Sequence, residues 1–317
     1  MRPQATKVSE VKEYLRLRRA LGFQMRSQGE MLLQFAKRLD RSGHRGPFTT
    51  AMALRWANQP QLSRSSRAKR LSAVRCFARY LAVRDGRTEV PDRYLVPKVV
   101  FRRQPHLYSE RELEQLLVAT DRLEPSYPLR RLLYRTLFGL LACTGLRISE
   151  ALKLNAVHVD LKHRVLRIEK TKFKKSRLVP LHPTATRALR RYADARFGHQ
   201  AVGDDSPFFV NRRGKRLTYC AVRWAYEYLR DMLGWKSNGE LPRPRIHDLR
   251  HTFACRRLLS WYRQGKNVQH LIAALSTYMG HGHVTDTYWY LTGTPELLSI
   301  AASRFEQFAR TKKGERA

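Results

Sequence analysis

Acidic residues are scarce in this chain. Its 317 residues include 26 Asp and Glu against 62 Lys and Arg, a formal net charge of +36. Such an excess of one sign favours a polyanionic partner, and nucleic acid is the leading candidate. The chain through Pro105 has 24 Lys and Arg against 7 acidic residues, and the remainder has 38 against 19. Because both halves are basic, the charge does not resemble the single cluster typical of membrane-surface binding.

Cysteines and long apolar runs are also few. The four cysteines are scattered without a Cys-x-x-Cys pair, which disfavours a zinc ribbon or a disulfide framework. The longest uncharged apolar stretch, residues 136–146, is too short to cross a bilayer. Residues 1–7 lack an apolar run after their basic residues, so we expect no signal peptide. These absences predict a cytoplasmic protein that has no membrane partner.

The length and the 43% hydrophobic content predict two globular domains rather than a disordered chain. Residues 1–85 are predicted to form a helical domain, because apolar residues recur at helical spacing. Its helices are expected at residues 8–21, 31–39, 49–57 and 63–83. The last of these carries six cations: Arg64, Arg67, Lys69, Arg70, Arg75 and Arg79. This face can be merely solvated or can contact DNA backbone. Residues 86–106 are rich in proline and predict a linker.

Residues 107–317 are predicted to form a second domain of mixed character. Ser109-x-x-Glu112 is a capping box at the start of a helix, and the apolar residues 129–142 predict a buried one. Short β-type runs follow at residues 157–161, 165–168 and 177–181, before helices resume near Thr184 and Thr218. The expected fold class is therefore mainly α with a small β-hairpin sheet, an α+β arrangement.

Three segments of the second domain contain residues suited to phosphate chemistry. They are Thr144-Gly-Leu-Arg-Ile-Ser-Glu150, His247-Asp-Leu-Arg-His251, and Gly280-His281 followed nine residues later by Tyr290. Arg147 lies near a helix start, where a cation opposes the helix dipole and so favours an anion-facing role. His247 and Arg250 are three residues apart and share one helix face. A long cationic side chain, Lys172, lies at the expected hairpin tip.

In order and spacing, these residues resemble the catalytic signature of the tyrosine recombinase (phage integrase) family. The matching set is Arg147, Lys172, His247, Arg250, His281 and Tyr290. The sequences that flank these residues also match the family, among them Arg-Leu-Val-Pro-Leu at 177–181 and Met-Gly-His at 279–281. The resemblance covers residues 108–290 by motif, and residues 1–85 look like the core-binding domain of the family. It implies a C-shaped clamp formed by that domain and an integrase-type catalytic domain.

The resemblance implies a metal-independent reaction that uses no cofactor. Tyr290 would attack the scissile phosphate to form a 3′-phosphotyrosyl bond. Arg147 and Arg250 would bind the non-bridging oxygens, and His281 would add a donor. Lys172 would protonate the leaving oxygen, with Lys174 as the reserve on the same loop, and His247 would assist proton transfer. Tyr288 is the other nearby tyrosine, but the nine-residue step from His281 selects Tyr290. Glu150 either orients neighbouring His or Arg side chains or simply begins its helix.

The implied partner is duplex DNA, bound by a homotetramer in the synaptic complex. Other recombinases or accessory DNA-bending proteins are further partners consistent with the family. The expected role is integration, excision or transposition of a mobile element, with resolution of chromosome or plasmid dimers as the alternative. An apolar stripe after Pro295, from Leu297 to Phe308, predicts a C-terminal helix. This helix either packs on its own domain or docks on a neighbouring protomer.

Three rival functions fit part of the pattern. His247 and His251 have the spacing of a zinc metalloprotease helix, with His281 or His283 as a third ligand. Against this, Asp248 replaces the required Glu and Arg250 would lie beside the metal. A non-catalytic DNA-binding protein is disfavoured because every polar catalytic position is filled. A type IB topoisomerase would share much of the chemistry but would relax DNA as a monomer.

Overall fold

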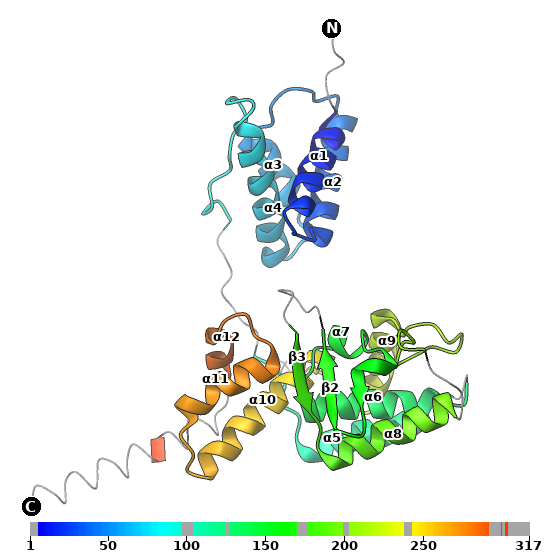
Figure 1. Ribbon diagram of the computed structural model, residues 1–317. Helices are drawn as coiled ribbons and strands as arrows, with labels where there is room; N and C mark the ends of the chain where they lie inside the picture. The colour runs from blue at the N-terminus through cyan, green and yellow to red at the C-terminus, as the bar shows by residue number, and fades with distance from the viewer. Residues whose placement is uncertain are drawn as a thin grey trace, which may run out of the picture. The chain divides into compact units, whose positions relative to one another are not determined.

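The computed structural model describes residues 6–96, 104–124, 127–169, 176–198, 203–237, 243–291, 299 and 302–303. The chain divides into two compact units, Met1–Arg102 and Arg103–Ala317. The described part of the chain is mostly helical and has one small sheet (Figure 1). This confirms the predicted fold class. Lys172, Lys174 and the apolar stripe after Pro295 lie outside the described residues.

The first unit is built from four helices around an aromatic core. They are α1 (Lys7–Ala20), α2 (Arg26–Arg41), α3 (Thr50–Ala57) and α4 (Arg64–Ala82). Thr6, Thr49 and Ser63 cap three of them by accepting backbone N–H groups. In the core the centroid of the Phe35 ring lies 5.3 Å from the ring centroid of Phe48 and 5.2 Å from that of Trp56. Aromatic rings bury large apolar areas, so this cluster gives the unit a core of its own.

Part of the segment predicted as a linker packs against this first unit. The Thr50 amide donates to Glu89 over 2.8 Å, and the Arg75 side chain donates to the carbonyls of Pro91 and Asp92. Thr88 is buried. Proline disfavours regular secondary structure, but it does not prevent a chain from lying against a folded surface.

The second unit places helices around a three-stranded antiparallel sheet. The sheet contains β1 (Val159–Asp160), β2 (Val165–Ile168) and β3 (Arg177–Pro180), in that order. Its helices are α5 (Glu110–Ala119), α6 (Arg130–Thr144), α7 (Ile148–Ala151), α8 (Pro183–Phe197), α9 (Tyr219–Met232), α10 (Ile246–Arg263), α11 (Val268–Met279) and α12 (Thr285–Tyr288). Three-residue 3₁₀ turns occur at Thr120–Arg122, Ala156–His158 and Trp289–Leu291.

Local sequence explains most of these boundaries. Ser109 and Glu112 form the predicted capping box of α5. The predicted strand at residues 157–161 is shorter than expected, because the His158 amide donates to the Asn155 carbonyl in a 3₁₀ turn before β1. The Asn155 amide donates in return to the His158 ring. In β2, Leu166 and Ile168 are buried whereas Arg167 is exposed, which is the alternation of a sheet with one covered face.

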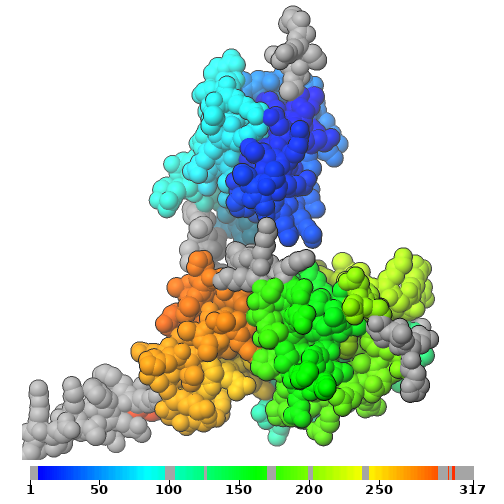
Figure 2. Space-filling view, viewed as in Figure 1, coloured from blue at the N-terminus to red at the C-terminus, as the bar shows by residue number. Residues whose placement is uncertain are grey.

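Packing within the second unit brings distant segments together. Helix α6 is apolar along most of its length and contacts both α8 and α10. Helix α11 contacts β3, so the C-terminal helices lie against the sheet-bearing part of this unit (Figure 2). The ends of α6 and α11 and the start of α10 therefore meet, and the candidate site lies there. None of the helices in the described part of the chain is long and apolar enough to cross a membrane.

Candidate active site

Arg147 lies in the turn that joins α6 to α7. Gly145 ends α6 with φ +62°, and a side chain at this position would meet Phe253 at 2.5 Å. Arg147 then caps α7, and its backbone amide donates to Glu150 over 3.0 Å. Its Nη1 donates to the other carboxylate oxygen of Glu150 over 2.8 Å. The Glu150 side chain therefore caps the start of α7 and also orients the guanidinium of Arg147.

Arg250 projects from α10 into the same region. Its side chain is 2% exposed, and it donates to the Gly145 carbonyl over 2.6 Å and to the Met279 carbonyl over 2.7 Å. Arg147 donates to the next carbonyl, that of Gly280, over 3.0 Å. Burial lowers the pKa of Arg250 to about 10, and the charge of Arg147 contributes. Arg250 remains cationic at neutral pH, so a buried positive charge lies in the site beside Arg147.

His281 follows directly after these carbonyls. Its Nδ1 lies 2.7 Å from the hydroxyl of Thr287, a side chain with no solvent exposure. Burial lowers the pKa of His281 to about 4, and Arg250 and Arg147 add to the shift. The imidazole is therefore neutral at pH 7 and carries one N–H group. If the Thr287 hydroxyl donates to Nδ1, that proton lies on Nε2.

Tyr290 lies beside His281, with 6.0 Å between the two ring centroids. It belongs to the 3₁₀ turn Trp289–Leu291, where its side chain is 3% exposed, whereas Tyr288 is 47% exposed. Two residues apart, the two tyrosines thus point to different environments. Burial raises the pKa of the Tyr290 hydroxyl, and both the charge of Arg250 and a side-chain hydrogen bond with it act in the opposite direction.

His247 and His251 lie one helical turn apart on α10. Their ring centroids are 4.8 Å apart, and the His251 ring is also 5.5 Å from that of Tyr290. The pKa of His247 is lowered by partial loss of solvent and by the charge of Arg250, although the residue is exposed at the surface of α10. Burial lowers the pKa of His251 to about 3, and its Nδ1 is buried without a hydrogen-bond partner among the residues that the structure describes. Both rings are therefore neutral at pH 7.

Metal binding by the His247–His251 pair finds no support in the surrounding side chains. Asp248 has no solvent exposure, and its carboxylate accepts hydrogen bonds from Arg245 over 2.8 and 3.3 Å. It thus caps α10 instead of facing a metal. Within the described ranges, no three His, Cys, Asp or Glu side chains are placed to hold a metal ion.

The structure thus brings together Arg147, Arg250, His281 and Tyr290, with His247 one turn away from Arg250. Two further participants, Arg177 and Thr287, were not predicted. Arg177 donates to both oxygens of Glu150 over 3.2 and 2.8 Å. In the sequence, only its position in the Arg-Leu-Val-Pro-Leu motif could have pointed to Arg177, and no sequence feature pointed to Thr287.

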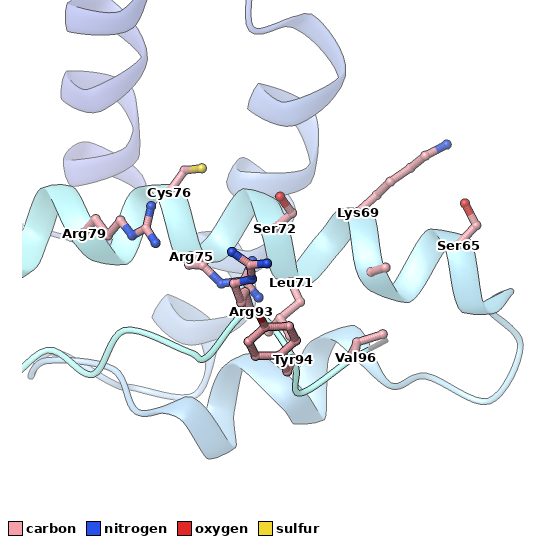
Figure 3. Close-up of a pocket in the computed structure, with 11 residues that line it drawn as sticks. Ser65, Lys69, Leu71, Ser72, Arg75, Cys76, Arg79, Arg93, Tyr94 and Val96 are labelled. Atoms are coloured by element: carbon pink, nitrogen blue, oxygen red, sulfur yellow. The ribbon is translucent and has the colours of Figure 1, made fainter. Parts of the chain in front are cut away.

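Helix α4 of the first unit presents a second basic surface. Arg67, Arg70 and Arg75 are held by hydrogen bonds to protein carbonyls, at Leu62, Trp56 and Pro91 respectively. Arg75 also lines an open groove along α4, with Ser65, Ser72 and Cys76 (Figure 3). The same groove is lined by Lys69 and Arg79. Neither side chain has a hydrogen bond or ion pair to another residue in the described part of the chain. Only some of the cations of α4 are therefore free to meet a ligand.

Comparison with known proteins points to one family. The sequence profile of the Phage integrase family matches residues 107–296. A Sinorhizobium fredii protein named as an integrase/recombinase, y4rB, is 40% identical over 302 residues, which cover 94% of this chain and 96% of that protein. Tyrosine recombinase XerC of Lacticaseibacillus casei is 32% identical over 235 residues, covering 72% of this chain and 74% of that protein.

Solved structures of similar fold were determined in complex with DNA. XerH site-specific recombinase bound to a palindromic difH substrate has a TM-score of 0.67 at 21% identity, covering 96% of this chain and 86% of that one. The Tn1549 transposon integrase in complex with a circular intermediate DNA has a TM-score of 0.69 at 18% identity, covering 95% of this chain and 99% of that one.

Proposed function

The chain belongs to the phage integrase family, whose tyrosine recombinases break and rejoin DNA, and on this premise we propose that it is a site-specific recombinase acting through a 3′-phosphotyrosyl intermediate. The observation that carries the proposal is the meeting of two guanidinium groups, a neutral imidazole and a buried tyrosine around the carbonyls of residues 279 and 280. This set can bind a phosphate and attack it.

The proposed first step breaks one phosphodiester bond. The Tyr290 oxygen attacks phosphorus, a phosphorus–oxygen bond forms to the tyrosine, and the bond to the 5′ oxygen breaks. Arg147 and Arg250 hold the non-bridging oxygens, because guanidinium groups bind phosphate through paired N–H donors. His281 donates from Nε2 to the same phosphate, with Thr287 fixing its ring.

Two proton transfers accompany this step. The raised pKa of Tyr290 means that its proton must leave as the attack proceeds, and neutral His247 on α10 is the proposed acceptor. Lys172 protonates the departing 5′ oxygen. Attack of a 5′ hydroxyl on the phosphotyrosyl bond then reverses these roles and rejoins the strand, so the reaction needs no external energy source.

Covalent trapping on nicked duplex DNA tests the proposal. The nick lets the cleaved fragment diffuse away, so the protein–DNA adduct accumulates and can be separated by denaturing electrophoresis. The wild type and Tyr288→Phe should form the adduct, whereas Tyr290→Phe should form none. An adduct with Tyr290→Phe that is lost in Tyr288→Phe would show that the nucleophile is assigned wrongly.

We propose that the biological role is integration, excision or transposition of a mobile element by a homotetramer on DNA. Similarity to y4rB over nearly the whole chain favours this role. Resolution of chromosome or plasmid dimers is the second candidate, because XerC proteins are also similar. Mapping covalently bound sites in genomic DNA separates the two, since a mobile element would place the sites at its own ends.

A further inference from the structure

Arg177, the first residue of β3, makes three hydrogen bonds to two segments far away in the sequence. Its Nε donates to the Tyr278 carbonyl over 2.7 Å at the end of α11. Its Nη1 and Nη2 donate to the two oxygens of Glu150 over 3.2 and 2.8 Å. The side chain is 10% exposed and that of Glu150 is 6% exposed. This paired geometry is the strongest form of the Arg–carboxylate interaction.

Glu150 is shared between two arginines. The same carboxylate accepts from the Arg147 backbone amide and from Arg147 Nη1. The three side chains therefore carry two positive charges and one negative charge in a largely buried cluster. Without Arg177, Glu150 would be paired with Arg147 alone, and that pair would present no net charge to a phosphate. A buried charge that loses one partner is also strongly destabilising.

The two arginines also hold the chain directly before His281. Arg147 binds the Gly280 carbonyl and Arg177 binds that of Tyr278. Gly280 has φ +66°, and a Cβ added there would lie 2.6 Å from Arg177 Nη1. The guanidinium of Arg177 therefore packs directly on the backbone of this glycine, in space that a side chain would occupy.

We propose that Arg177 is a positioning residue for the phosphate-binding site. It neutralises Glu150, so that Glu150 can orient Arg147 without cancelling the charge that Arg147 offers to the scissile phosphate. It also fixes the 278–280 segment that leads into His281. This role rests on the proposed recombinase activity, because it acts through Arg147 and His281 and not through contact with DNA.

The test is the single-turnover rate of covalent adduct formation on nicked DNA at saturating protein. Arg177→Met should lower the rate by about 100-fold, the loss typical of weakened transition-state charge stabilisation. The double variant Arg177→Met/Glu150→Gln removes the uncompensated carboxylate and should recover to within about 10-fold of the wild type. Arg216→Met is the matched control, since Arg216 also donates to backbone carbonyls, at Leu152 and Leu154, but pairs with no carboxylate in the described part of the chain. It should cleave at nearly the wild-type rate.

A second substrate separates charge positioning from leaving-group protonation. In DNA with sulfur in place of the 5′ bridging oxygen, the thiolate leaves without a proton, so the Arg177→Met defect should persist. Restoration of the wild-type rate by sulfur would overturn the proposal, as would an undiminished rate for Arg177→Met or no recovery in the folded double variant. Thermal unfolding of each variant verifies folding. If the wild type itself forms no adduct, the recombinase proposal fails, and not merely the role of Arg177.

Discussion

At the scale of single residues, Thr287 is a small side chain that contacts the ring of His281. It has no solvent exposure and its hydroxyl holds the Nδ1 of His281. Thr287→Val keeps the shape but removes the hydroxyl, so it should slow adduct formation by about 10-fold, the kinetic equivalent of one hydrogen bond. Thr287→Ser keeps the hydroxyl and should cleave nearly as fast as the wild type. Equal rates for the valine and serine variants would contradict this assignment.

The buried histidines also predict how stability depends on pH. The pKa of His281 is lowered to about 4, whereas in the unfolded chain it is near its ordinary value of about 6.5. Between these values the unfolded state binds a proton that the folded state does not, so stability falls as the pH drops below about 6.5. The melting temperature of His281→Gln should therefore fall by about 2 °C less than that of the wild type between pH 7 and pH 5. A larger fall for the variant would exclude this cause.

At the scale of one element, the cations of α4 divide by their partners. Lys69 and Arg79 line the open groove along α4 (Figure 3), whereas Arg67 and Arg70 bind protein carbonyls. Lys69→Ala/Arg79→Ala should weaken DNA binding and reduce the slope of log affinity against log salt by about 2, because each removed cation leaves one phosphate without its partner. Titrations by fluorescence anisotropy at several salt concentrations measure this slope.

The matched control for this prediction lies on the same helix. Arg67→Ala/Arg70→Ala removes the same charge but breaks hydrogen bonds within the first unit. It should lower the free energy of unfolding by about 1 kcal/mol for each side chain. Its salt slope should stay close to that of the wild type. If both pairs change the slope equally, the surface of α4 does not distinguish free from bound cations.

At the scale of the whole molecule, each unit has a separate hydrophobic core. The first contains Tyr14, Phe35, Trp56 and Phe77, and the second is built around α6 and the sheet. A fragment of residues 1–102 should therefore fold alone, with a helical circular dichroism spectrum and one cooperative thermal transition. A spectrum of an unfolded chain would show that the first core depends on the second unit.

Much of the fold was predictable because its signals are local. Helix caps such as Thr49, Ser63 and Ser109 lie within a few residues of the amides that they bind, and the apolar period of α6 lies within one element. The extent of β1 was less predictable, because a 3₁₀ turn with both a backbone and a ring hydrogen bond between Asn155 and His158 precedes it.

The sequence by itself determined which reactive groups the protein has. It showed the cationic excess and the absence of a membrane-spanning run, and it gave the order of the candidate site residues Arg147, His247, Arg250, His281 and Tyr290. Only the tertiary structure decided which cations are free. Arg147 and Gly280 are 133 residues apart, as the hydrogen bond between them shows, and Arg177 reaches Glu150 across 27 residues. Contacts of this range depend on how helices pack, and periodicity within one element does not encode them. The same packing buries Tyr290 and exposes Tyr288. The nine-residue step from His281 favoured Tyr290 over Tyr288, but only the fold shows that the two side chains lie in different environments.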